Sequence, residues 1–417
     1  MNNKLTLSTG WLRAWTSTLV FLLPFICLIT LSGVSVTSFL FLLTAIPLYL
    51  RGRAAVAYNW PAVKWVVFAF FYYLAFAAFC YIVRPVAPLS NLEKPSRMFF
   101  AISALMVVLV AQPRRRALWW GVIAGALVAL PLVAWQRLVL DIERPGGVFN
   151  AITYGDLSLC LALMALAAAA DFRGGARQAI WPALGALAGL AGSILSGTRG
   201  GWIALALAAV AFLRHGHLAP GGRVRALLLA SFALFVASWF VPALGMQGRV
   251  AQGVFDVRTW IDGGSAFSNV GIRLELWKSA FMLVAEHPWF GLDPADYTLE
   301  LADWAVAGKI DRVVLTMPHM HNDALQAVVT GGIPGLVAWF GIIAAPFAFF
   351  ARAMRGAAAS GARTFAPALA GMLLVICYFS FGLTEVIFWS VSSSLFYALM
   401  VFLLMGFCLI EKERIGK

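Results

Sequence analysis

The sequence predicts an all-α, polytopic integral membrane protein with about 12 transmembrane helices and one large loop. The composition is far from that of a soluble domain, because 62% of the 417 residues are hydrophobic and only 12% are charged. Runs such as 66–82, 118–140 and 226–244 approach or exceed the roughly 20 residues that span a bilayer. Lipid cannot satisfy open backbone groups, so these runs are expected to be helices.

Twelve apolar segments are candidate spans. The first run, 19–31, continues without a small-residue cleavage site, so we expect a retained helix and not a signal peptide. Very short turns follow the first and seventh spans, which predicts a hairpin at each place. The spans are expected near residues 15–32, 34–50, 64–83, 98–111, 117–139, 154–170, 179–196, 201–213, 226–244, 324–350, 364–382 and 386–410.

Charge predicts the orientation of these spans. With the N-terminus in the cytoplasm, every cytoplasmic connection is positive, as the positive-inside rule requires. Most of the 31 Lys and Arg then lie inside, whereas of the 18 Asp and Glu only Asp171, Glu411 and Glu413 do. The net charge of +13 is therefore explained by topology, and no nucleic-acid partner is expected.

The chain is expected to divide into three parts. Residues 1–244 would hold helices 1–9, residues 245–322 a large periplasmic loop, and residues 323–417 helices 10–12. A loop of that length is too long for a plain connection, and long loops are usually functional. The apolar periodicity of residues 272–286 predicts a surface helix in this loop, and the turn-rich stretch that follows is expected to end it.

Two histidines stand where this loop re-enters the membrane. His321 is the best candidate for a general base, because histidine titrates at roughly 6.5 and can take a proton from a hydroxyl group. Asn322 and Asp323 resemble a helix N-cap and first turn, and a helix N-terminus favours anions. The alternative is that His319 and His321 merely line a polar membrane interface.

Three outward-facing arginines are candidates for binding phosphate, whose oxygens match the fork of a guanidinium group. Arg199 lies in a glycine-rich turn, where it could instead snorkel to lipid headgroups. Arg273 is expected at the start of the loop helix, where a cation is unfavourable without a partner; an ordinary solvated position beside Glu275 or Trp277 is the alternative. Arg144 lies in another outer turn and is the weakest of the three candidates for binding phosphate.

Few other residues are candidates. Glu385 is the acid near the outer end of the last hairpin, and it could pair with a histidine or with an arginine. The five cysteines lie in apolar spans without metal-ligand spacing, and no nucleotide or metal motif occurs in a suitable context. We therefore expect no metal and no cofactor.

Three motifs in order resemble those of the bacterial O-antigen ligase and O-antigen polymerase superfamily. They are residues 321–336, beginning HNDALQ and ending TGGIPGL, residues 286–294, EHPWFGLDP, and residues 196–202, SGTRGGW. Residues 147–150, GVFN, are also similar to a loop of that family but lack the usual Pro before Asn150. Ala324 stands where an aromatic residue is frequent.

The resemblance implies a metal-independent, GT-C-like glycosyltransferase of the bacterial inner membrane with its active site facing the periplasm. Its donor would be O-antigen on undecaprenyl diphosphate, and its acceptor a sugar hydroxyl of lipid A–core. His321 would be catalytic, and Arg199 and Arg273 would bind the diphosphate. His319, Asn322, Arg144 and Glu385 would support them, and membrane lipids would surround the chain.

Three further interpretations of the function stay open. A single large late loop favours a ligase, whereas a polymerase often carries a second one; a protein O-oligosaccharyltransferase of the same superfamily is also compatible. A transporter for lipid-linked glycan should show charged residues or broken helices near the middle of the bilayer. Here the charged groups gather at the ends of the spans, with Arg137 as the nearest exception, and this favours surface catalysis.

Overall fold

The described part of the chain is helical throughout. The computed structural model describes residues 2–84, 89–172, 176–198, 200–215, 246–360 and 364–415, together with 233, 236, 237, 239 and 240. In chain order the helices are α1 (Asn2–Ile26), α2 (Gly33–Ala45), α3 (Tyr49–Tyr58), α4 (Trp60–Val83), α5 (Ser90–Phe100), α6 (Ile102–Ala111), α7 (Arg115–Leu138), α8 (Ala151–Ala168), α9 (Ala176–Leu195), α10 (Gly201–His215), α12 (Met246–Ile261), α13 (Gly271–Glu286), α14 (Pro294–Val306), η3 (Arg312–Thr316), α15 (Asp323–Ser360), α16 (Phe365–Gly382), η4 (Ile387–Trp389) and α17 (Val391–Ile415).

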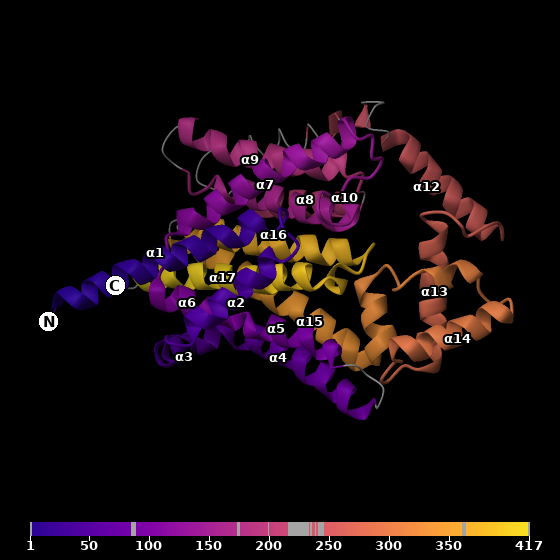
Figure 1. Ribbon diagram of the computed structural model, residues 1–417, viewed down its shortest axis with the longest axis horizontal. Coiled ribbons are helices and arrows are strands. Elements are labelled where there is room, and N and C mark those ends of the chain that lie inside the picture. The colour runs from indigo at the N-terminus through magenta and orange to yellow at the C-terminus, as the bar shows by residue number, and fades with distance from the viewer. Residues whose placement is uncertain are drawn as a thin grey trace.

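A bundle of long apolar helices forms the body of the molecule (Figure 1). Helices α8, α16 and α17 are the most deeply buried, and their apolar side chains form one continuous core with those of α1, α6 and α7. Helix α4 instead leaves large apolar residues such as Trp65 and Phe71 exposed. A helix that is apolar on its outer face is suited to lipid and not to water.

The predicted polytopic helical architecture is confirmed, but the count of twelve spans is not. Among the described residues, eight helices are long and apolar enough to cross a membrane, or up to nine if the bent pair α2 and α3 is one span. Two predicted spans, 15–32 and 201–213, coincide with the shorter apolar helices Gly10–Ile26 and Gly201–Ala211. The predicted span 226–244 lies mostly outside the described residues.

Two predicted spans have a different shape in the structure. Residues 34–50 were expected to form one span, and in the structure α2 and α3 meet there at 93°, because Pro47 between them cannot continue a helix. The last span begins at Val391 and not at 386, because residues 387–389 form the short η4 turn. This turn becomes part of the candidate active site.

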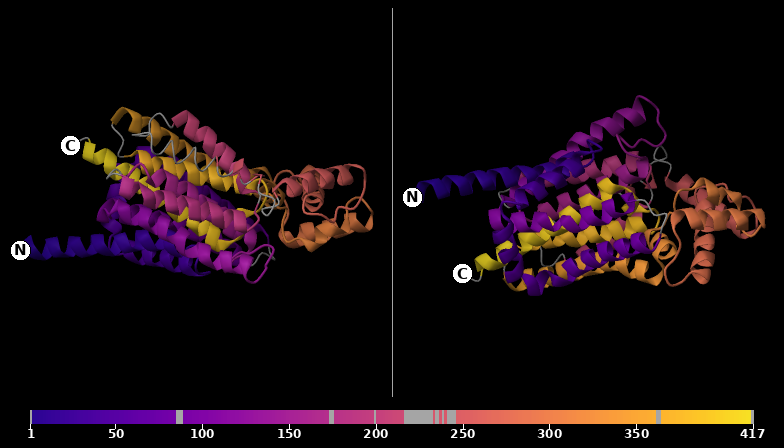
Figure 2. Two further views of the ribbon diagram at one scale, coloured as in Figure 1. Left: turned by 90° about the horizontal axis from the view of Figure 1, so that it is seen from above. Right: turned by 60° about the horizontal axis from the view of Figure 1, so that its bottom comes forward.

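Helices α12, α13 and α14 gather at one end of the bundle, opposite the end that carries both termini (Figures 1 and 2). The surface helix expected at 272–286 is α13, and Leu276, Ala280 and Leu283 on its predicted apolar face are buried. They join Tyr297, Leu301 and Trp304 of α14 in a second, smaller core. The segment between α12 and α15 therefore folds as a packed cap, and its periplasmic location stays a prediction.

Two glycines allow this cap to pack closely against α15. Gly332 interrupts α15 with φ 60° and ψ −157°, and a Cβ there would lie 2.3 Å from the backbone of Trp289. Gly291 also has positive φ, and a Cβ there would lie 2.3 Å from the carbonyl oxygen of Val329. The amide of Leu292 donates to that carbonyl at 2.8 Å, and the amide of Ile333 donates to the carbonyl of Pro288 at 2.9 Å. Only glycine combines this conformation with such close approach.

Candidate active site

The two histidines lie in the short connection between η3 and α15, and Asn322 fixes where this connection ends. The Asn322 side-chain oxygen accepts the Leu325 amide at 3.0 Å, which makes it the predicted N-cap of α15. Its side-chain nitrogen donates to the carbonyl of Leu383 at 3.0 Å and so ties α15 to the end of α16. His321 has φ 48°, a left-handed conformation that few residues with side chains adopt.

Glu385 lies between the two imidazoles. Its Oε2 is 2.9 Å from Nδ1 of His321, and its Oε1 is 3.3 Å from Nε2 of His319. The three side chains are largely enclosed, with 10% of His319, 17% of His321 and 10% of Glu385 exposed. The sequence left open whether Glu385 pairs with a histidine or an arginine, and the structure gives it both histidines.

This arrangement sets the protonation of the cluster. Burial raises the pKa of Glu385, but hydrogen bonding and charge from His321, with help from His319 and the Val386 amide, hold the pKa below its ordinary value. Burial and the neighbouring His321 lower the pKa of His319, although Glu385 opposes them. A carboxylate only accepts hydrogen bonds, so Nδ1 of His321 is the donor, and in the neutral imidazole Nε2 keeps a free lone pair.

A hollow of about 320 Å³ opens in front of this cluster. His319, His321 and Glu385 line it together with Arg144 and residues 150–153 at the start of α8. Gln136 of α7 holds the loop that carries Arg144, because its amide group exchanges two hydrogen bonds with Gly147, at 2.8 and 3.0 Å. Arg137 lies at the end of α7, where it donates to the carbonyl of Glu143 at 2.6 Å.

Arg273 of α13 lies within electrostatic reach of this cluster without lining the hollow. Burial and the charge of Arg144 lower its pKa, whereas Glu385 and Asp156 raise it. Its Nε is buried with no hydrogen-bond partner among the described residues. Glu275, one alternative partner, is instead bound by Trp260, Lys278 and the amide of Asp311. Such an unsatisfied buried donor calls for an explanation, and an anionic ligand would provide one.

Arg199 lies outside the described residues, but the residues beside it pack near the cluster. The hydroxyl of Thr198 donates to the carbonyl of Ala151 at 2.8 Å, and Gly201 lies against Asp156 and Leu159 of α8. A Cβ on Gly200 would lie 2.3 Å from the Thr384 hydroxyl, directly before Glu385. Thr198, Gly200 and Gly201 thus lie between α8 and the end of α16.

Two groups of side chains in the described part of the chain could hold a metal ion. The ligand atoms of His319, His321 and Glu385 all lie within 4.8 Å of one another, as do those of Glu286, His287 and Glu300. In the first group the carboxylate oxygens are already paired with imidazole nitrogens. In the second, Nε2 of His287 is 2.9 Å from Glu300. Both sets of contacts suit hydrogen-bonded pairs, so a metal is not needed to explain either geometry.

Several site residues were missed from the sequence. Trp389 lines the hollow, and its ring centroid is 5.2 Å from that of His319. Asp156 is 1% exposed inside α8, and its Oδ1 has no partner among the described residues. A buried acid inside an apolar span is itself a functional signal, and this signal was available at Asp156. Nothing in the pattern around Trp389 indicated a η4 turn.

The fold and this cluster together define a multi-pass helical membrane protein with an enclosed histidine–carboxylate site at one end. A family model described as O-antigen ligase matches residues 183–340. An uncharacterized protein of Haemophilus influenzae is 21% identical over 291 residues, which is 69% of this chain and 72% of that protein. Residues 183–340 hold all three motifs, so the resemblance to the O-antigen ligase superfamily is confirmed for this part of the chain. Members of that superfamily are glycosyltransferase-like enzymes of bacterial inner membranes.

Proposed function

We propose that this protein is an O-antigen ligase that acts on the periplasmic side of the inner membrane. The donor is an O-antigen chain on undecaprenyl diphosphate, and the acceptor is a sugar hydroxyl of lipid A–core. The observation that carries the proposal is the hollow that His321, held by Glu385, lines together with Arg144. A base and a phosphate-binding cation at one surface are what a transfer from a lipid diphosphate requires.

His321 acts as the base of a single displacement. Its Nε2 takes the proton of the acceptor hydroxyl while that oxygen bonds to the anomeric carbon of the donor sugar. The bond between this carbon and the diphosphate oxygen breaks on the opposite face, and the electron pair leaves with the diphosphate. One displacement inverts the anomeric configuration.

The arginines stabilise the leaving diphosphate. Its charge grows as the glycosidic bond breaks, so a cation placed there stabilises the transition state more than the ground state. Arg273 is within electrostatic reach of Arg144 and of Glu385, and Arg199 is the third arginine proposed for this role. With the arginines in this role the reaction is expected to be independent of a metal ion and of any cofactor.

Reconstituted protein tests the function directly. Purified protein in proteoliposomes is mixed with lipid-diphosphate-linked O-antigen and rough lipopolysaccharide, with and without EDTA. A ligase yields O-antigen attached to the lipopolysaccharide in both cases. Lengthening of the lipid-linked chain without any acceptor would identify a polymerase instead, and transfer to an added pilin only would identify a protein O-oligosaccharyltransferase. Loss of transfer with EDTA that Mg²⁺ restores would refute metal independence.

A further inference from the structure

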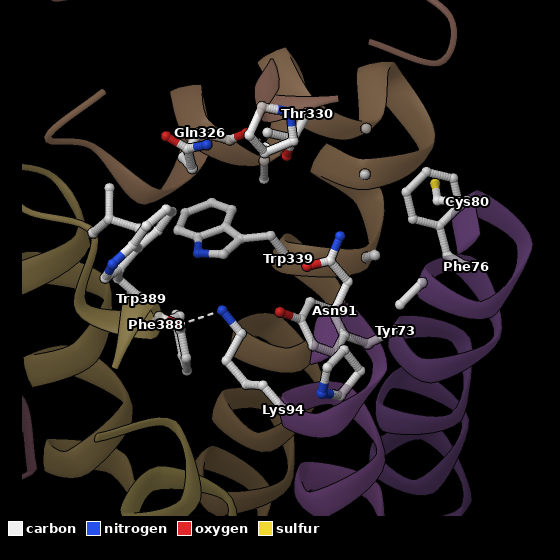
Figure 3. A pocket seen from close by; sticks show the side chains of 18 of the residues that line it. Tyr73, Phe76, Cys80, Asn91, Lys94, Gln326, Thr330, Trp339, Phe388 and Trp389 are labelled. Carbon is white, nitrogen blue, oxygen red and sulfur yellow. Dashed lines mark hydrogen bonds between the residues drawn. The ribbon is translucent and has the colours of Figure 1, made fainter. Parts of the chain in front are cut away.

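A second hollow, of about 380 Å³, lies beside the candidate active site between α4, α5, α15 and the η4 turn (Figure 3). Aromatic side chains form much of its wall, among them Tyr73, Phe76 and Trp339. Asn91, Gln326 and Thr330 also line it with groups that can hydrogen-bond. A concave site with apolar walls and a few placed polar groups is the usual form of a small-ligand pocket.

Two polar atoms on its lining residues are buried without a partner among the described residues. They are the indole nitrogen of Trp339, whose residue is 6% exposed, and Oδ2 of Asp323, whose residue is 3% exposed. The ammonium group of Lys94 also lines the hollow and donates to the carbonyl of Phe388 at 2.6 Å (Figure 3). A buried donor and a buried acceptor left open are costly, unless a ligand or water satisfies them.

The η4 turn separates this hollow from the candidate active site. Val386 and Trp389 line both hollows. Asp323 follows His321 by two residues, and its Oδ1 accepts the amide of Phe388 at 3.3 Å. A ligand bound in the second hollow would therefore lie on the other side of this turn from His321 and Arg144, within reach of the first hollow past Val386 and Trp389.

We propose that the second hollow binds a sugar ring of the acceptor and so orients its hydroxyl toward His321. A sugar combines flat apolar faces, which pack on aromatic rings, with hydroxyls that both donate and accept hydrogen bonds. The unpaired indole N–H of Trp339 offers a donor, and the side chains of Asn91, Gln326 and Thr330 add further hydrogen-bonding groups. The acceptor role rests on the proposed function, whereas the presence of a sugar site does not.

The native thiol of Cys80 reports on occupancy. Cys80 lines the second hollow and is partly exposed, whereas Cys27, Cys160, Cys377 and Cys408 are buried. Alkylation of Cys80 by a maleimide is followed by mass spectrometry, with Cys80→Ser as the control. Rough lipopolysaccharide should slow the reaction about five-fold or more, whereas lipid A without core sugars and the lipid-linked donor should not. Protection by lipid A alone, by the donor alone, or by nothing would overturn the proposal.

A kinetic test uses Trp339→Phe, which removes the indole N–H and keeps an aromatic ring. Loss of one hydrogen bond should raise the KM for rough lipopolysaccharide about five-fold and leave the KM for the donor unchanged. Trp65→Phe is the matched control, because Trp65 is 58% exposed on α4 and lines neither hollow. An unchanged acceptor KM, or a raised donor KM, would overturn the proposal. Protection of Cys80 in wild-type protein that transfers no glycan would refute the ligase function and leave the sugar site standing.

Discussion

At the scale of residues, the site depends on a carboxylate that two imidazoles share. Glu385 fixes the proton of His321 on Nδ1 through the 2.9 Å contact, and this leaves Nε2 as the basic nitrogen. The left-handed backbone of His321, at φ 48°, is a conformation that proteins retain mainly where a function depends on it. The geometry therefore indicates an orienting role for Glu385 and a chemical role for His321.

Glu385→Gln should lower kcat about 10- to 100-fold while the donor KM stays close to that of wild type. The amide removes the negative charge that orients and stabilises the imidazole, but it leaves the arginines in place. Initial rates at varied donor concentration measure both quantities. A change confined to KM would contradict the orienting role.

The same substitution should change the pH dependence of stability. Because the pKa of Glu385 is held below 4.5, its contribution to stability is present at neutral pH and is lost as pH falls through the folded pKa. Glu385→Gln should thus melt below wild type at neutral pH, and the two curves should converge in acid. Thermal unfolding in detergent across this range measures the difference. A difference in melting temperature that widens toward acid would contradict this prediction.

Arg273→Lys should reduce kcat/KM for the donor about ten-fold or more, because lysine keeps the charge but lacks the fork that matches phosphate oxygens. Arg258→Lys in the same cap is the control, since Arg258 is exposed and lines neither hollow. Equal rates for the two variants would remove Arg273 from the phosphate-binding group.

The sequence indicated most of these residues but not their contacts. His319, His321, Arg144, Arg273 and Glu385 were all expected to be functional, and the structure brings them to one place. Glu385 follows His321 by 64 positions, and no periodicity relates residues so far apart, so their pairing could not be predicted. Their catalytic and binding roles stay proposals.

At the scale of elements, two of the glycine-containing motifs pack against each other. Residues 286–294 and the break at Gly332 dock backbone to backbone, and the guanidinium group of Arg84 donates to the carbonyls of both Phe290 and Thr330. Periodicity predicted α13 and the start of α15 because their apolar faces repeat. Periodicity could not place the break in α15, although Gly331, Gly332 and Pro334 were a local signal for one.

Gly332→Ala should disrupt this docking, because the new methyl group would lie 2.3 Å from the Trp289 backbone at a positive φ. We expect loss of transfer together with faster proteolysis within residues 246–322. Gly248→Ala is the control, since a Cβ there meets nothing within 4 Å. A Gly332→Ala protein with the melting temperature and the proteolysis rate of wild type would contradict this docking.

At the scale of the whole molecule, the two ends of the bundle differ in chemistry. The candidate site and the cap lie at one end, and both termini lie at the other (Figure 2). At the second end Arg13, Arg114, Arg115 and Arg116 surround a hollow of about 280 Å³. This asymmetry agrees with the positive-inside rule and favours a periplasmic site.

Single cysteines test this orientation in intact cells. In a Cys80→Ser background, in which the remaining four cysteines are buried, Ser265→Cys should react with a membrane-impermeant thiol reagent. Gly10→Cys near the N-terminus should react only after lysis. The reverse pattern would place His321 on the cytoplasmic face and away from the periplasmic glycan.

The central claim is that His321 is the base of a direct glycan transfer, and the transfer rate of His321→Ala tests it most directly. The rate is measured in proteoliposomes with saturating lipid-linked donor and rough lipopolysaccharide, alongside binding of the donor. We expect the rate to fall at least about 100-fold while donor binding persists, because alanine removes the base but not the arginines. Transfer at a rate within a few-fold of wild type would contradict the account.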